Sequence, residues 1–214
     1  MKKALEAYWG DKISAEELLK VAKEQRLNTY ATIKEQGVDF VPTGTFSLYD
    51  HVLDMSNTLG IIPEAYAKSG LSQLDTYFAM ARGHQKGGVD LPATEMKKWF
   101  DSNYHYLVPE FSEKSEFKLN DNKPVDDFIE AKEAGYNARP VILGPLTLLW
   151  LGKTSKDAQD PNFNRYSLLP KLAQTYVQLF EKLAAAGAPW VQLDEPILVV
   201  DTAKQLSNEF KQTY

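Results

Sequence analysis

Apolar positions along the chain follow one arrangement that occurs three times. An amphipathic helix ends at a glycine, and a short apolar strand then runs until it reaches polar or proline residues. Ser14 and Glu17 have the spacing of a capping box at the start of the first helix, and Pro124 suits the first turn of the second. The predicted helices end at Gly37, Gly135 and Gly187, and the predicted strands lie at 38–46, 140–145 and 190–193.

This order of elements predicts an α/β fold whose parallel strands are covered by helices. A closed (β/α)8 TIM-type barrel and an open doubly wound sheet both satisfy the pattern. No Gly-x-Gly-x-x-Gly follows any of the strands, which disfavours dinucleotide binding and favours the barrel. A complete barrel needs eight strands in about 250 residues. Three strands, with a fourth candidate at 117–120, therefore predict an incomplete barrel.

A long segment separates the first two strands. Helical patterns at 49–59, 71–81 and 93–100 are divided by turn-like breaks, which predicts a helical insertion after an early strand. In a barrel, such an insertion lies at the ligand-binding end of the strands. We expect one partial barrel domain over 1–214, with helices and the early strand in 1–46, the insertion in 47–116 and further βα units in 117–214.

Composition narrows the possible chemistry. The absence of cysteine excludes disulfides, a cysteine nucleophile and zinc sites with thiolate ligands. The three histidines lie too far apart in the sequence for a metal-binding motif, so we expect no metal site. A net charge of −5 provides no basic field for nucleic acid. No apolar run reaches the length of a membrane span or a signal peptide, so we expect no membrane partner and a cytoplasmic location.

Two adjacent carboxylates, Asp194 and Glu195, follow the last predicted strand. Catalytic groups usually lie at the carboxyl ends of barrel strands, so on sequence alone these are the best acid–base candidates. The competing interpretation is that they cap the following loop. Arg82 with Gly83 either binds an anion or ends a helix, and the pattern does not separate these two roles.

Several segments resemble the amino-terminal half of cobalamin-independent methionine synthases, in the same order along the chain. The string Lys-Trp-Phe-x-x-Asn-Tyr-His-Tyr is long and rich in aromatic residues, so a chance match is improbable. The matching segments are KKALEAYW (2–9), YDHVLD (49–54), YFAMARG (77–83), EMKKWFDSNYHY (95–106), VILGP (141–145) and WVQLDEP (190–196).

The resemblance implies transfer of a methyl group from polyglutamated 5-methyltetrahydrofolate to homocysteine, in an enzyme of two face-to-face (β/α)8 barrels. It places zinc in the carboxy-terminal barrel, with ligands that include cysteines. It also implies that the amino-terminal barrel binds the folate's glutamate tail through lysines that match Lys2 and Lys98 here, and lysine suits several carboxylates because it is a flexible point charge. Asn103 and His105 are weaker candidates, as are Asp194 and Glu195.

The family's Arg-Glu-apolar-Lys motif is incomplete here, since Met1 matches its apolar position and Lys2 its lysine. We therefore expect a domain truncated at both ends, inactive alone, without a cofactor of its own and without the carboxy-terminal catalytic barrel. Its open strand edges would associate with that missing barrel or with another copy. The alternatives are a non-catalytic folate-binding or interaction module from the same barrel, and an independent barrel enzyme that uses Asp194 or Glu195.

Overall fold

The computed structural model describes all 214 residues. Its central feature is a three-stranded parallel sheet in the order β1–β7–β9, made of β1 (Val41–Thr43), β7 (Ala138–Leu143) and β9 (Gln192–Asp194). β1 pairs with the first half of β7 and β9 with its second half. All three strands predicted from the helix–glycine–strand pattern are confirmed, and so is the α/β class.

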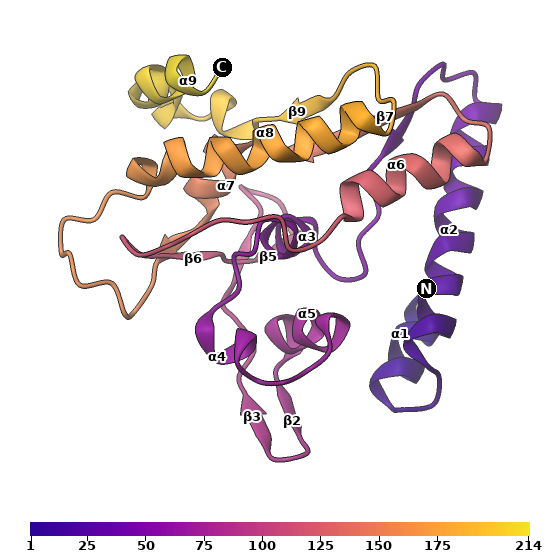
Figure 1. Cartoon of the computed structure of the whole chain (residues 1–214), viewed down its shortest axis with the longest axis horizontal. Coiled ribbons are helices and arrows are strands. Elements are labelled where there is room, and N and C mark those ends of the chain that lie inside the picture. Colours follow the sequence, from indigo (N-terminus) through magenta and orange to yellow (C-terminus); the bar gives the residue numbers. More distant parts are fainter.

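The three predicted amphipathic helices are also confirmed as α2 (Ala15–Glu35), α6 (Lys123–Glu133) and α8 (Leu169–Ala185). Ser14 forms the predicted capping box with Glu17. The chain leaves α8 through Gly187 at φ +91°, a conformation that residues with a Cβ rarely adopt. Figure 1 shows α8 lying along the sheet, with α6 beside it and α2 at the side of the molecule.

Two hydrophobic clusters hold these layers together. The larger contains 27 buried residues and joins the sheet to α6 and α8, where side chains at spacings of three and four face inward, including Leu172, Tyr176, Leu179 and Leu183. The smaller cluster, of 10 residues, packs α5 (Gln73–Arg82) against α3 (His51–Thr58) and the start of α2. Shortening a core leucine such as Leu172 to alanine would cost about 2–5 kcal/mol.

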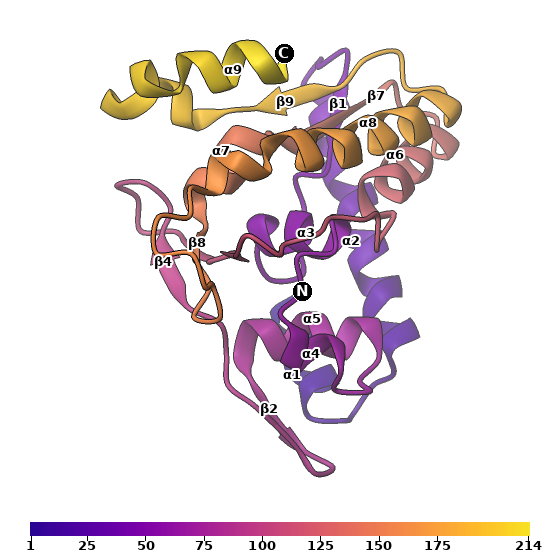
Figure 2. The same ribbon diagram turned by 60° about the vertical axis from the view of Figure 1, so that its left-hand side comes forward.

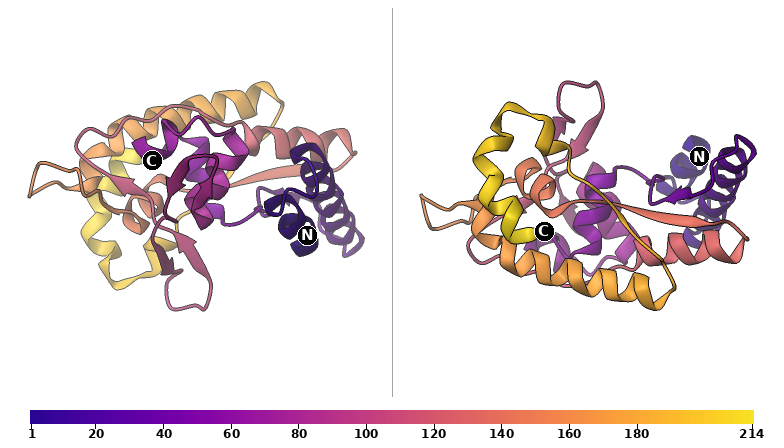
Figure 3. Two further views of the ribbon diagram at one scale, coloured as in Figure 1. Left: turned by 90° about the horizontal axis from the view of Figure 1, so that it is seen from below. Right: turned by 90° about the horizontal axis from the view of Figure 1, so that it is seen from above.

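The remaining elements are short. Helices are α1 (Lys2–Trp9), α4 (Glu64–Ala67), α7 (Pro145–Leu151) and α9 (Ser207–Thr213), with 3-10 turns at Arg165–Leu168, Pro196–Val199 and Asp201–Leu206. Strands are β2 (His84–Lys86), β3 (Val89–Leu91), β4 (Met96–Lys98), β5 (His105–Leu107), β6 (Glu110–Phe111) and β8 (Lys153–Thr154). The β2–β3 hairpin projects from the lower end of the molecule (Figure 2), and the amino- and carboxy-terminal helices lie on opposite sides (Figure 3).

Two predicted elements are wrong. The helix predicted at 93–100 is instead strand β4, which pairs antiparallel with β5 and places Met96 opposite Leu107. The candidate strand at 117–120 joins no sheet. Its alternating apolar side chains pack on the core, but the N–H groups of Lys118 and Asn120 donate to carbonyls at the end of α3.

β1 and β9 each pair with one strand only, so the parallel sheet has two unpaired edges. None of the helices combines the length and the apolar character needed to cross a bilayer.

Candidate functional site

A cleft of ≈ 880 Å³ opens at the carboxyl ends of β1, β7 and β9. Parallel sheets place their ligands at this end, because the loops that follow the strands converge there. Side chains from the β1–α3 loop, α3 and the β4–β5 hairpin close its other walls. The lining residues are Gly44, Thr45, Ser47, Tyr49, His51, Asp54, Met55, Thr58, Trp99, Tyr104, Lys123, Pro124, Val141, Ile142, Leu143, Leu193, Asp194, Glu195 and Pro196.

Asp50 joins α3 to the hairpin at one side of this cleft. Its Oδ2 accepts hydrogen bonds from Leu53 N at 2.9 Å, which caps α3, and from Leu107 N at 3.1 Å on β5. Its Oδ1 accepts one from the Tyr104 hydroxyl at 2.7 Å. The Asp50 residue is 1% exposed, so removing this acceptor would leave buried donors without partners.

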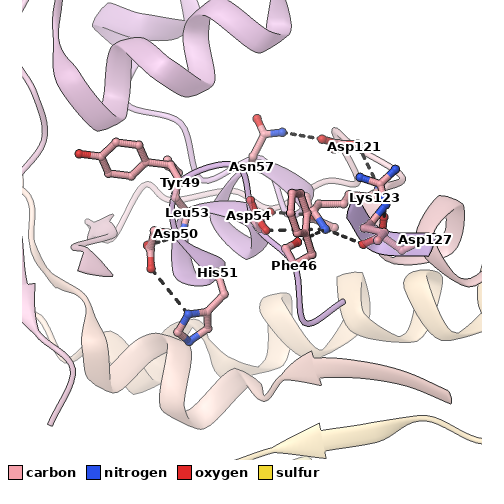
Figure 4. Close-up of polar contacts among 12 residues, drawn as sticks. Phe46, Tyr49, Asp50, His51, Leu53, Asp54, Asn57, Asp121, Lys123 and Asp127 are labelled. Carbon is pink, nitrogen blue, oxygen red and sulfur yellow. Dashed lines mark hydrogen bonds and ion pairs between the residues drawn. The ribbon is translucent and has the colours of Figure 1, made fainter. Parts of the chain in front are cut away.

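His51 is the first residue of α3 and points into the cleft (Figure 4). Its ring lies edge-on to Trp99, with centroids 4.5 Å apart, and stacks on Tyr104 at 5.6 Å. Burial lowers the pKa of the imidazole, and this outweighs the raising effect of Asp50 and Asp194. The side chain is therefore a neutral imidazole at neutral pH.

Asp54, one helical turn further on, lies in the floor of the cleft. Burial raises the pKa of this carboxyl to about 6, although nearby Lys123 lowers it. The Tyr77 hydroxyl donates to Asp54 Oδ1 at 2.7 Å, and Lys123 Nζ lies 3.8 Å from Oδ2.

The charge of the Lys123 ammonium group is paired within the protein. It donates to Asp127 Oδ2 at 2.5 Å and to the carbonyl of Phe46 at 2.8 Å (Figure 4). Burial lowers the pKa of Lys123, but Asp127 and Asp54 together raise it by more. Asp127 also lies 3.4 Å from Arg26, which makes two 2.8 Å hydrogen bonds to Glu130. The cleft thus contains no uncompensated cation.

The two adjacent carboxylates after β9 differ in their surroundings. Glu195 accepts hydrogen bonds from Leu146 N at 2.9 Å, Thr147 N at 2.7 Å and Thr147 Oγ1 at 2.5 Å, so its carboxylate caps the amino-terminal end of α7. Gly144 permits this approach, since a Cβ there would lie 2.2 Å from Glu195 Cδ. Asp194 is exposed and accepts one side-chain hydrogen bond, from Gln192.

The lysines named from the sequence lie outside the cleft and do not contact each other. Lys2 is on α1, where its side chain is 88% exposed and 3.8 Å from Glu6. Lys98 ends β4, exposed and directly opposite His105 on β5. Asn103 is in the turn of the same hairpin, and its carbonyl lies 2.9 Å from His105 Nδ1. Lys98 is thus next to Trp99, which does line the cleft.

Sequence reasoning missed most of the cleft. His51 was only one of three isolated histidines, although an aspartate directly before a helical pattern is a recognisable cap signal. The donors around the cleft do not fit a zinc ion, because no group of three or more His, Cys, Asp or Glu side chains is arranged to hold a metal. We assign no chemical step in this chain to a metal.

Comparison with known proteins matches the whole chain. The family described as "Cobalamin-independent synthase, N-terminal domain" matches residues 1–214. A protein of Schizosaccharomyces pombe named probable 5-methyltetrahydropteroyltriglutamate–homocysteine methyltransferase is 50% identical over 220 residues, which cover 100% of this chain and 28% of that protein. The correspondingly named proteins of Saccharomyces cerevisiae and Coxiella burnetii (strain Dugway 5J108-111) are 49% and 45% identical over 100% of this chain, which spans 28% and 27% of their lengths.

Proposed function

Because the chain belongs to the family of cobalamin-independent synthase N-terminal domains, we propose that it is the amino-terminal part of a methyltransferase that carries a methyl group from 5-methyltetrahydropteroyltriglutamate to homocysteine. The relatives that support this bear that activity in their names and match the chain from end to end. The chain's own part in the reaction is to bind the glutamate tail of the methyl donor.

A triglutamate tail carries several carboxylates and needs cations that are free to meet them. Lys98 is exposed and forms no ion pair within the chain, whereas its neighbour Lys97 lies 3.4 Å from Glu95 and Lys2 lies 3.8 Å from Glu6. An unpaired ammonium loses no existing partner when it meets a carboxylate. The free charge of Lys98 is the observation on which the proposal rests. Lys2 is a second contact, because its pair with Glu6 at 3.8 Å is exposed to solvent and therefore weak.

Calorimetry of the 214-residue chain with 5-methyltetrahydropteroyltriglutamate tests this site. We expect Lys98→Ala to weaken binding by about tenfold, the loss of one charge-assisted contact, while Lys97→Ala on the opposite face of β4 changes it less than about twofold. The monoglutamate form should bind more weakly than the triglutamate form and be insensitive to Lys98→Ala. Equal affinity for the two tail lengths would contradict the proposal.

We assign no acid–base step to Asp194 or Glu195. The Glu195 carboxylate is already committed to the α7 amino terminus, so it is not available to a substrate. Zinc, which would hold homocysteine as a thiolate, belongs in this proposal to a carboxy-terminal barrel. We expect no methyl transfer by the isolated chain with zinc, homocysteine and methylfolate. Turnover above background would overturn this part of the proposal.

We further propose that β1, β7 and β9 are part of a (β/α)8 barrel and that their unpaired edges are covered by further barrel strands or by another copy of the chain. A cytoplasmic location stays a prediction. The alternative, a non-catalytic folate-binding module, predicts the same tail binding but no effect of this chain on methyl transfer when it is mixed with a separate carboxy-terminal barrel.

A further inference from the structure

The hydrogen bonds around His51 determine which of its nitrogens carries the proton. The Tyr104 hydroxyl has one hydrogen, and it donates this to Asp50 Oδ1 at 2.7 Å. His51 Nδ1 lies 3.3 Å from the same hydroxyl oxygen, which is then left as an acceptor. A neutral His51 therefore carries its proton on Nδ1, and the lone pair of Nε2 is free in the cleft, where it makes no hydrogen bond with the rest of the chain.

The charged groups of the cleft point to the same class of ligand. Asp194 uses one carboxylate oxygen for the Gln192 amide at 2.8 Å, and its other oxygen has no partner. Lys123, the lining cation, is neutralised by Asp127 and Asp54. A ligand carboxylate would therefore meet acidic groups and no free cation. A group that donates N–H bonds would meet acceptors at His51 and Asp194.

The aromatic side chains of the cleft favour a planar group. Trp99 stands edge-on to His51, at 67° between the rings, while Tyr104 is stacked on it at 29°. Tyr104 is 43% exposed, so part of its ring is available for contact. Planar cations and electron-poor heterocycles bind well to such faces.

We propose that this cleft binds a planar N–H donor group of the amidine type, with His51 Nε2 and the free oxygen of Asp194 as acceptors. Two sources have this chemistry, the 2-amino-4-oxo edge of a pteridine ring and the guanidinium of an arginine side chain. The site is separate from the tail contact at Lys98, and it goes beyond the proposed function because it needs no glutamate tail.

The test uses the full 214-residue chain and NMR of its three histidine side chains. In the free protein at neutral pH, the ring-nitrogen shifts of His51 should show the proton on Nδ1. Titration with 2-amino-4-oxopteridine and with methylguanidine, neither of which carries a carboxylate, then probes the two sources. His51→Phe should weaken the binding of the effective probe by about tenfold, while His84→Phe, on the distant β2 strand, should leave it unchanged.

A response to the pteridine alone identifies the folate ring as the ligand, and a response to methylguanidine alone identifies an arginine. A response to both supports the amidine class. The inference is overturned if neither probe binds, if acetate binds His51 as tightly as they do, or if the proton is found on Nε2. Since the probes lack a tail, these results are independent of whether triglutamate binds at Lys98.

Discussion

Replacing Glu195 by alanine should lower the free energy of unfolding by about 2–3 kcal/mol. The carboxylate accepts two backbone hydrogen bonds from the first turn of α7, at 2.9 Å from Leu146 N and 2.7 Å from Thr147 N. It also accepts side-chain hydrogen bonds from the Thr147 hydroxyl at 2.5 Å and the Tyr214 hydroxyl at 2.8 Å. Loss of a helix cap costs about 1 kcal/mol, and a carboxylate at a helix amino terminus contributes about 0.3–1 kcal/mol more. The remaining loss of unfolding free energy comes from the hydrogen-bond donors that are left without an acceptor. This cost is smaller than for a fully buried site, because Glu195 is only half-buried.

Urea unfolding followed by far-ultraviolet circular dichroism measures this change, provided that the slope with denaturant stays constant. Asp194→Ala is the matched control, since this adjacent carboxylate is exposed, and it should cost less than about 0.5 kcal/mol. Glu195→Gln keeps one acceptor oxygen and should cost about 1 kcal/mol. Equal losses for the Glu195 and Asp194 alanine variants would refute the assignment of Glu195 as the α7 cap.

Two further predictions concern the buried charges behind the cleft. Arg26→Ala should lower the free energy of unfolding by about 3 kcal/mol in the same assay, because it leaves Asp127 and Glu130 without this partner. The side chains of these two carboxylates are 5% and 11% exposed. A loss no larger than that caused by Lys23→Ala, at an exposed lysine, would contradict this prediction. The pKa of Asp54 is raised to about 6 in the folded state, so the protonated form favours folding. The stabilisation from this protonated carboxyl is complete below the unfolded-state pKa near 4 and is lost as the pH rises through 6. Relative to Asp54→Asn, wild type should lose about 2 kcal/mol of unfolding free energy between pH 4 and 7. Parallel pH profiles would contradict this.

The parts of the fold that the sequence predicted are those whose signals are local. Each of the three long helices carries its own apolar stripe and terminal glycine, the first two also carry a start signal, and each strand of the parallel sheet is a short apolar run. The spacing of the apolar residues Met96, Trp99 and Phe100 is that of one face of a helix. Their backbone instead pairs with the segment around Tyr104–Leu107, as in the 2.7 Å hydrogen bond from Trp99 N to Tyr104 O. That choice depends on a partner strand, which periodicity does not reveal.

In the candidate site, too, local sequence signals predict the position of residues but not the roles that depend on distant segments. The position of Asp194 and Glu195 at the cleft follows from their place after a strand, but their separate roles depend on where α7 begins. Gly144 and Pro145 offer that helix no side-chain cap of its own, so its free N–H groups need an acceptor from elsewhere in the chain. A helix that begins at Gly-Pro, with no capping side chain of its own, therefore predicts that a carboxylate from a distant segment caps it.

The β4–β5 hairpin connects the two proposed binding sites. It carries Lys98 on its exposed face and, through Trp99 and Tyr104, one wall of the cleft. Asp50 fixes it to α3 by accepting from both Leu107 N and the Tyr104 hydroxyl, so the orientation of His51 and the position of the hairpin depend on one buried carboxylate. A ligand that moved the hairpin to meet Lys98 would have to break these hydrogen bonds. Breaking each buried bond costs more free energy than one exposed contact with the ligand would contribute. The tail contact and the cleft are therefore expected to act as one rigid surface.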